Sequence, residues 1–252
     1  MKKILITGAS GNIGFLARIA YRDHQLTLWS RTPISLNNNE VWQKSEPLQN
    51  LYWWENLDLT NRFDVILHLA EPVKKRIRED ECLKIVNSHT SFLKKASDSA
   101  NTVLYPDTAY NYDRHLSKIN FQYKLIKNLT RKEIIHKKNI YMPIIHPLID
   151  YGTGLLATTK IIEKIPFFNI LCEIDSTLPI LKKTDLSNYL HLFLDGKIMP
   201  DDWYSYEDSI SKIFYCPNKS DNIYISKLLI KTMMLFDYLP LISLILNGRK
   251  LR

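Results

Sequence analysis

Cysteine is scarce in this sequence and is thinly spread along it. Its three cysteines, Cys82, Cys172 and Cys216, are far apart, odd in number and without any C-x-x-C spacing. This distribution argues against a disulfide framework and against a zinc site, and it fits a reducing compartment. We therefore expect no bound metal and a cytoplasmic location.

Long uninterrupted apolar runs are also missing. Residues 228–246 are largely apolar, but Lys231, Asp237 and Pro240 interrupt them. A buried helical hairpin is therefore expected there rather than a membrane span. The apolar run at residues 1–6 is too short for a signal peptide.

Dense runs of basic residues are absent too, although the chain is basic overall. The formal net charge is +8, but the lysines and arginines are scattered and not interleaved with aromatic residues. This pattern disfavours a nucleic-acid partner and is compatible with an anionic small-molecule substrate.

What the chain does contain is a regular alternation of short apolar runs and amphipathic segments. Continuous apolar strands that alternate with helices predict a parallel sheet covered on both faces, which is a doubly wound α/β fold. In the first helix we expect Phe15, Leu16, Ile19 and Ala20 to face inward. The expected strands are 3–7, 25–29, 65–69, 102–105 and 139–146, and the expected helices are 13–22, 80–97 and 119–136.

The alternation weakens after about residue 152. We expect a dinucleotide-binding domain over residues 1–152 and a small, more helical substrate domain over residues 153–252. Within the second part, residues 178–190 are candidates for a return to the core of the first.

A glycine motif follows the first expected strand. Residues 7–14 read TGASGNIG, which is a T-G-x-x-G-x-x-G spacing between a strand and a helix. Such glycines allow a tight turn, a close approach of pyrophosphate and close packing of the helix, whose N-terminal N–H groups then face the phosphates. An ordinary glycine turn is the alternative, but the strand–turn–helix context favours a dinucleotide. The expected contacts are Gly8, Ser10, Gly11, Asn12, Ile13 and Gly14.

The end of the second expected strand bears on which dinucleotide binds. An acidic residue there usually accepts a hydrogen bond from the ribose 2′-hydroxyl of NAD, but this chain has Ser30 and Arg31. Because a hydroxyl and a guanidinium suit a 2′-phosphate, NADP is favoured and NAD remains possible. The alternative is that Arg31 is a solvent-facing loop residue.

In order and spacing, these features resemble the extended short-chain dehydrogenase/reductase family, the NAD-dependent epimerase/dehydratase group. The resemblance covers residues 3–190 and implies a Rossmann fold. It also implies a homodimer as a possible assembly. Further cofactor contacts that it implies are Asp58 and Leu59 at the adenine, Leu69 and Ala70 after His68, Asn87 on the following helix, and Pro147 in the segment 146–152.

The resemblance also assigns catalytic roles. Tyr123 and Lys127 match the family's Y-x-x-x-K motif, and Thr108 stands where the family has a catalytic Ser or Thr. Residues at i and i+4 share one face of a helix. A free tyrosine has a pKa of about 10, and a neighbouring ammonium favours the phenolate, which prepares Tyr123 for proton exchange. Lys127 would also hold the nicotinamide ribose, and Thr108 would position the substrate oxygen.

Some positions depart from the family's pattern. Glu71 stands where a small residue is common and would bring negative charge near the pyrophosphate. His146 replaces an arginine, and the loop between Thr108 and Tyr123 is short. His68, at the end of an apolar strand, is expected to be a satisfied core histidine.

These observations favour an NADP(H)-dependent oxidoreductase, a keto-reductase acting on a nucleotide sugar. One alternative is a nucleotide-sugar epimerase or dehydratase that retains NAD. Another is a non-catalytic dinucleotide-binding sensor or scaffold.

Overall fold

Six parallel strands form the central sheet of the computed structural model. They lie in the order β3-β2-β1-β4-β5-β7, and every neighbouring pair is parallel. Their bounds are β1 Lys3–Thr7, β2 Gln25–Ser30, β3 Glu40–Lys44, β4 Phe63–His68, β5 Ala100–Leu104 and β7 Ile140–Tyr141. The structure describes residues 1–45, 53–55, 59, 63–71, 79–108, 111, 121–145, 174–179, 183–195 and 222–226.

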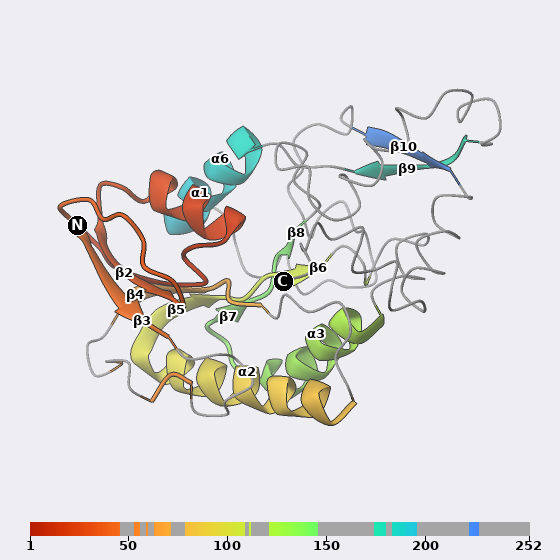
Figure 1. The fold of residues 1–252 in the computed structure, drawn as a ribbon, viewed down its shortest axis with the longest axis horizontal. Coiled ribbons are helices and arrows are strands. Elements are labelled where there is room, and N and C mark those ends of the chain that lie inside the picture. The colour runs from red at the N-terminus through yellow and green to blue at the C-terminus, as the bar shows by residue number, and fades with distance from the viewer. Residues whose placement is uncertain are drawn as a thin grey trace, which may run out of the picture.

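Helices cover both faces of this sheet. Helices α1 (Asn12–Ala20) and α6 (Lys183–Leu194) lie on one face, and α2 (Glu79–Ser99) and α3 (Phe121–Ile134) lie on the other (Figure 1). The predicted doubly wound fold is therefore confirmed. Chain order reverses between β1 and β4, and in such sheets a ligand binds at the carboxyl ends of the strands beside that switch point.

Strand β1 shows why the strands are apolar throughout. Ile4 and Ile6 belong to the core cluster beneath α1 and α6, whereas Leu5 belongs to the cluster beneath α2. Because successive side chains of a strand point to opposite faces, a sheet covered on both sides needs apolar residues at every position.

Helix α6 brings residues from far along the chain into the first of these cores. Its buried side chains pack with those of α1, and the hydroxyl of Tyr21 donates a hydrogen bond to the carbonyl oxygen of Leu190 at 2.8 Å. The boundary expected at residue 152 lies outside the described residues. The α6 residues in the cluster are Leu186, Tyr189, Leu190, Phe193 and Leu194.

Two pairs of short strands lie outside the large sheet. Strand β6 (Asp107–Thr108) pairs in parallel with β8 (Ile144–Ile145), and β9 (Ile174–Pro179) pairs antiparallel with β10 (Asn222–Ser226). In the part of the chain that the structure describes, no helix has the length and apolar content needed to cross a bilayer.

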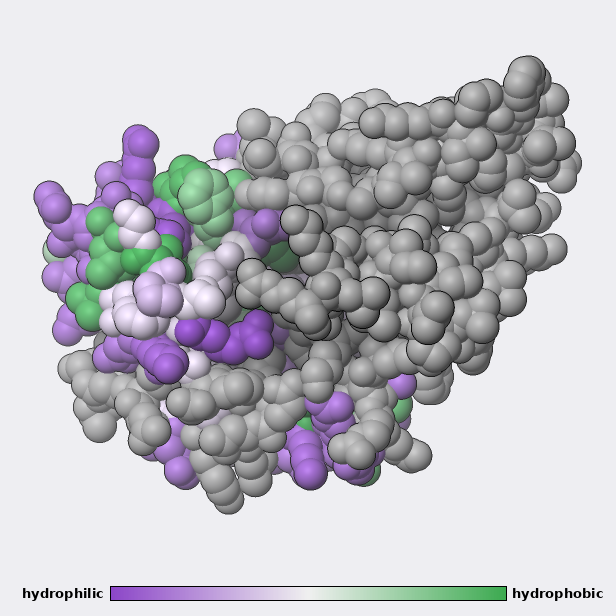
Figure 2. Space-filling view, in the orientation of Figure 1, coloured by the Kyte–Doolittle hydropathy of each residue, from purple (hydrophilic) through white to green (hydrophobic). Residues whose placement is uncertain are grey.

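Three expectations about local structure were wrong. Leu16 and Ala20 of α1 are buried as expected, but Phe15 and Ile19 are about half exposed, because the side of α1 that faces the core carries Leu16, Ala17 and Ala20. Figure 2 shows the resulting apolar area over α1.

The other two errors concern strands. The strand expected over 139–146 is split into β7 and β8 around Pro143, which lacks the N–H that a continuous ladder requires. Strand β3 was missed, because its residues Glu40 to Lys44 combine a buried carboxylate with partly exposed side chains rather than an apolar run.

Candidate active site

The glycine turn joins β1 to α1 at the switch point of the sheet. Gly8 has φ +68°, a conformation that residues with a Cβ rarely adopt. A Cβ there would lie 2.7 Å from the backbone of Leu69 and Ala70. Glycine at this position therefore lets the turn lie directly against the carboxyl end of β4.

The third glycine of the motif lets the helix approach the turn. A Cβ on Gly14 would lie 2.5 Å from the carbonyl oxygen of Gly8 and 2.7 Å from Ala9 Cα, so only glycine fits. The N-cap residue Gly11 has no capping side chain, which leaves the start of α1 suited to an anion. Ser10, Gly11 and Asn12 are exposed at this turn, and Ile13 is partly buried.

At the end of β2, the two residues expected to contact the ribose 2′-position, Ser30 and Arg31, differ in their availability. Ser30 is buried, and its hydroxyl donates to the carbonyl oxygen of Thr32 at 2.6 Å while it accepts from Trp42 Nε1 at 2.8 Å. Since a serine has one donor, only Arg31, which is exposed, remains available to a phosphate. The nearby carboxylate of Glu40 is held by Arg18 at 2.7 Å and thus does not replace the missing acidic residue.

The end of β4 lies beside the glycine turn. The N–H of Leu69 donates to the carbonyl oxygen of Thr7, and the N–H of Ala70 donates to Thr7 Oγ1, each at 3.2 Å. Both residues are partly buried, whereas Leu59 is buried in the core beneath α2. Asn87 is exposed on α2. Asp58, His146 and Pro147 lie outside the described residues.

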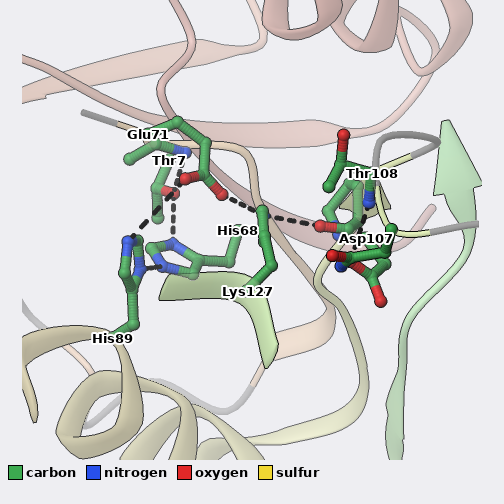
Figure 3. A network of polar contacts seen from close by, with 10 residues as sticks. Thr7, His68, Glu71, His89, Asp107, Thr108 and Lys127 are labelled. Atoms are coloured by element: carbon green, nitrogen blue, oxygen red, sulfur yellow. Dashed lines mark hydrogen bonds and ion pairs between the residues drawn. The ribbon is translucent and has the colours of Figure 1, made fainter. Parts of the chain in front are cut away.

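Lys127 is a buried cation near this edge of the sheet. Its side chain is 1% exposed, and its Nζ donates to the carbonyl oxygen of Pro106 at 2.6 Å and to the carboxylate of Glu71. Nζ also lies 3.9 Å from the ring centroid of Tyr105 and 5.7 Å from that of Tyr123. The expected tyrosine and lysine therefore lie near each other. Figure 3 shows Glu71 bound to Lys127.

A chain of buried polar groups continues from Glu71. Its Oε2 lies 3.9 Å from His89 Nε2, His89 Nδ1 lies 2.7 Å from His68 Nε2, and His68 Nδ1 lies 2.7 Å from Thr7 Oγ1. His68 and His89 are fully buried. The expectation that His68 is a satisfied core histidine is confirmed.

Burial dominates the protonation of these groups. It lowers the pKa of His89 to about 3 and that of His68 well below its usual value, and the charge of Lys127 adds to both effects. Burial also raises the pKa of Glu71, a shift that Lys127 opposes. Both imidazoles are consequently neutral near pH 7, and the charges in this cluster are those of Glu71 and Lys127.

Thr108 lies on β6, beside a second ion pair. It is buried, and its N–H donates to Asp107 Oδ1 at 2.8 Å. Asp107 also accepts from Asn111 at 2.9 Å and pairs with Arg131 of α3 at 3.3 Å. Burial raises the pKa of Asp107, whereas Lys127 lowers it.

Sequence reasoning proposed Thr108, Tyr123 and Lys127 as catalytic residues but missed their polar surroundings. The contacts of His89 with His68 and of Asp107 with Arg131 join different secondary-structure elements, so no local sequence pattern predicts them. Glu71 was noted only as an unusual charge. An isolated acidic residue at a strand end, in a chain with a candidate catalytic lysine, was the available signal for their pairing.

Comparison with known proteins gives matches in structure only. No protein-family model and no curated protein sequence matches the chain. WbmH of Bordetella bronchiseptica, solved with NAD+, has a TM-score of 0.60 and 13% identity over 78% of this chain and 73% of its own. WbmG of the same organism, solved with NAD and UDP, has 0.58 and 15% over 77% and 68%.

A third structure carries the family's description. It is a short-chain dehydrogenase family protein from Francisella tularensis subsp. tularensis SCHU S4, with a TM-score of 0.54 and 14% identity over 77% of this chain and 91% of that one. At such identities the likeness establishes the fold. The chain thus has the Rossmann fold found in structures of the short-chain dehydrogenase type.

Proposed function

We propose that this protein is a nicotinamide-dinucleotide-dependent oxidoreductase of the short-chain dehydrogenase type. The observation that carries the proposal is the buried Lys127, whose Nζ lies 5.7 Å from the ring of Tyr123, near the end of β4 where the glycine turn packs. A lysine buried at the carboxyl end of the sheet, beside a tyrosine and next to the glycine turn, favours a catalytic role.

The glycine turn fits a dinucleotide pyrophosphate. Gly11 is exposed and has no Cβ, so a phosphate can approach its backbone and the start of α1. Arg31 is the exposed cation at the end of β2, and the described residues around it include no free carboxylate for a ribose 2′-hydroxyl. These features favour NADPH over NADH.

A dinucleotide bound at this turn would supply the hydride for reduction of a carbonyl. Tyr123 then transfers its phenolic proton to the carbonyl oxygen, so that one hydride and one proton yield an alcohol. Thr108 donates a hydrogen bond to the same oxygen and fixes its position. Lys127 stabilises the phenolate that Tyr123 becomes.

We further propose a nucleotide sugar as the substrate, reduced at a keto group. The net charge of +8 favours an anionic diphosphate, and the similar fold of WbmG was solved with UDP as well as NAD. The alternative, an epimerase or dehydratase that retains NAD, is favoured by the NAD present in both Bordetella structures.

Titration of the purified protein with NADPH and NADH, followed by fluorescence, tests the cofactor proposal. We expect NADPH to bind more tightly, and Arg31→Ala to weaken NADPH about tenfold without affecting NADH, which corresponds to one lost charge-assisted contact. Arg22→Ala, an exposed arginine after α1, is the matched control. Tightly held NAD would favour the epimerase alternative, and failure to bind either dinucleotide would contradict the proposal.

A further inference from the structure

The ammonium of Lys127 has three partners among the described residues of its own protein. An ammonium has three donors, and here they meet the Glu71 carboxylate, the Pro106 carbonyl and the face of the Tyr105 ring. A lysine that holds a nicotinamide ribose needs one donor for the ribose hydroxyls. Of the three partners, Glu71 is the one that carries a charge, and it directly follows Ala70, whose backbone lies against Gly8.

A chain of buried polar groups ends 3.9 Å from the Glu71 carboxylate, at His89 Nε2. Ala70 N–H donates to Thr7 Oγ1, so the Thr7 hydroxyl is well placed to donate to His68 Nδ1. His68 Nε2–H then donates to His89 Nδ1, which puts the remaining hydrogen of His89 on Nε2, facing Glu71 Oε2. The opposite order would set a nitrogen lone pair facing the carboxylate, so an ionised Glu71 fits the first order.

We propose that Glu71 is a positioning residue that restrains and neutralises Lys127, and thereby controls both the acidity of Tyr123 and the capture of a dinucleotide. This inference rests on the proposed function, because it assigns Tyr123 and Lys127 their catalytic roles. Glu71 acts only through Lys127. When the ion pair opens, Lys127 gains a free donor for the ribose and its charge is no longer cancelled beside Tyr123.

The charges around the pair make this control effective. His68 of β4 and His89 of α2 are neutral, and Tyr105, which directly follows β5, has a pKa well above its usual value because it is buried. Asp107 of β6 and Arg131 of α3 neutralise each other at 3.3 Å. The local net charge is therefore near zero with Glu71 ionised and rises to +1 without it, and a positive site favours both phenolate and pyrophosphate.

Glu71→Gln tests the proposal because it keeps an acceptor for Lys127 and removes only the charge. Ionisation of Tyr123 is followed as the phenolate absorbance that Tyr123→Phe removes, and NADPH affinity is measured by fluorescence. We expect Tyr123 to ionise about one pH unit lower in Glu71→Gln and NADPH to bind about tenfold more tightly. Glu133→Gln, which removes an exposed carboxylate of α3 that pairs with Lys94 at 3.7 Å, is expected to change neither.

A second variant distinguishes loss of folding from loss of the interaction between Glu71 and Lys127. If Glu71→Gln unfolds because Lys127 is left buried without a counter-charge, Glu71→Gln with Lys127→Met removes both charges and is expected to fold again. Recovery by this double variant supports the pairing, and no recovery overturns it.

The remaining outcomes decide between the two proposals. A folded Glu71→Gln protein with unchanged Tyr123 ionisation and unchanged NADPH affinity overturns the role of Glu71. If the native protein binds neither NADPH nor NADH, the proposed function fails, but the Tyr123 ionisation needs no dinucleotide and still reports on Glu71.

Discussion

At the scale of single residues, His68 and His89 show how burial determines protonation. Each is fully enclosed, each contacts the other at 2.7 Å, and neither faces a carboxylate within hydrogen-bond distance. Burial therefore lowers both pKa values, and the folded protein holds these imidazoles neutral at pH values where the unfolded chain takes up protons.

This difference predicts a stability that falls in acid. The stabilising effect is complete above about pH 6.5, the unfolded pKa, and is lost as the pH drops towards the folded pKa of about 3 for His89. Between pH 6.5 and 5 the loss is about 2 kcal/mol for His89. Urea unfolding at several pH values measures it, and His89→Gln is expected to show a shallower decline.

The raised pKa values of two carboxyl groups act in the opposite direction. Burial raises the pKa of Glu71 and of Asp107 above their unfolded values, so ionising them in the folded state costs stability as the pH rises and this cost disappears in acid. Both proteins contain Glu71 and Asp107, so this contribution cancels when the pH slope of His89→Gln is subtracted from that of the native protein. Identical pH slopes in the two proteins would contradict the assignment to His89.

At the scale of elements, the glycines of the turn between β1 and α1 have different roles: Gly14 is needed for packing and Gly11 for binding. Gly14 has backbone atoms of Gly8 and Ala9 within 2.9 Å of where a Cβ would be, whereas Gly11 has only the Gly8 carbonyl at 3.2 Å. The clash at Gly14 cannot be relieved without moving the helix, whereas the contact at Gly11 needs a shift of only a few tenths of an ångström.

Gly14→Ala and Gly11→Ala are therefore expected to differ in kind. Gly14→Ala forces α1 away from the turn and should cost about 1–3 kcal/mol of unfolding free energy, as overpacking does. Gly11→Ala should change stability by less than about 1 kcal/mol and weaken NADPH at least tenfold, since its Cβ blocks the pyrophosphate. Denaturant unfolding and fluorescence titration of both variants check this, and similar losses of stability would contradict it.

At the scale of the whole molecule, α6 is the described element that ties late residues to the first core. Leu190 is 1% exposed within the cluster that includes Leu16 and Tyr21 of the N-terminal region. Removing apolar volume there affects the same core that supports β1 and the glycine turn, although more than 160 residues separate the partners along the chain.

Leu190→Ala is expected to lower the unfolding free energy by about 2–5 kcal/mol, the usual cost of such a cavity. We expect one cooperative transition, because α6 and the sheet share a core. Thermal unfolding followed by circular dichroism measures it, with Asn188→Ala, on the exposed side of α6, as control. A separate early transition would show instead that α6 unfolds independently of the sheet.

Local sequence patterns predicted the elements that a single local feature of the sequence, such as an apolar run or a glycine spacing, specifies. Apolar runs located β1, β2, β4 and β5, and the glycine spacing located the turn. They failed where tertiary contacts decide: Phe15 and Ile19 are exposed because α6 and the strands bury another side of α1. Pro143 divides β7 from β8, although the flanking residues are apolar.

The sequence by itself determined the doubly wound architecture and the proximity of Tyr123 and Lys127, because strand period, helix period and glycine spacing are local properties of the chain. Only the tertiary structure decided what surrounds Lys127. Glu71, His89 and Tyr105 come from three separate segments, and their contacts depend on sheet order and helix packing. Burial then determines which of these groups are charged, and burial is a property of the folded molecule.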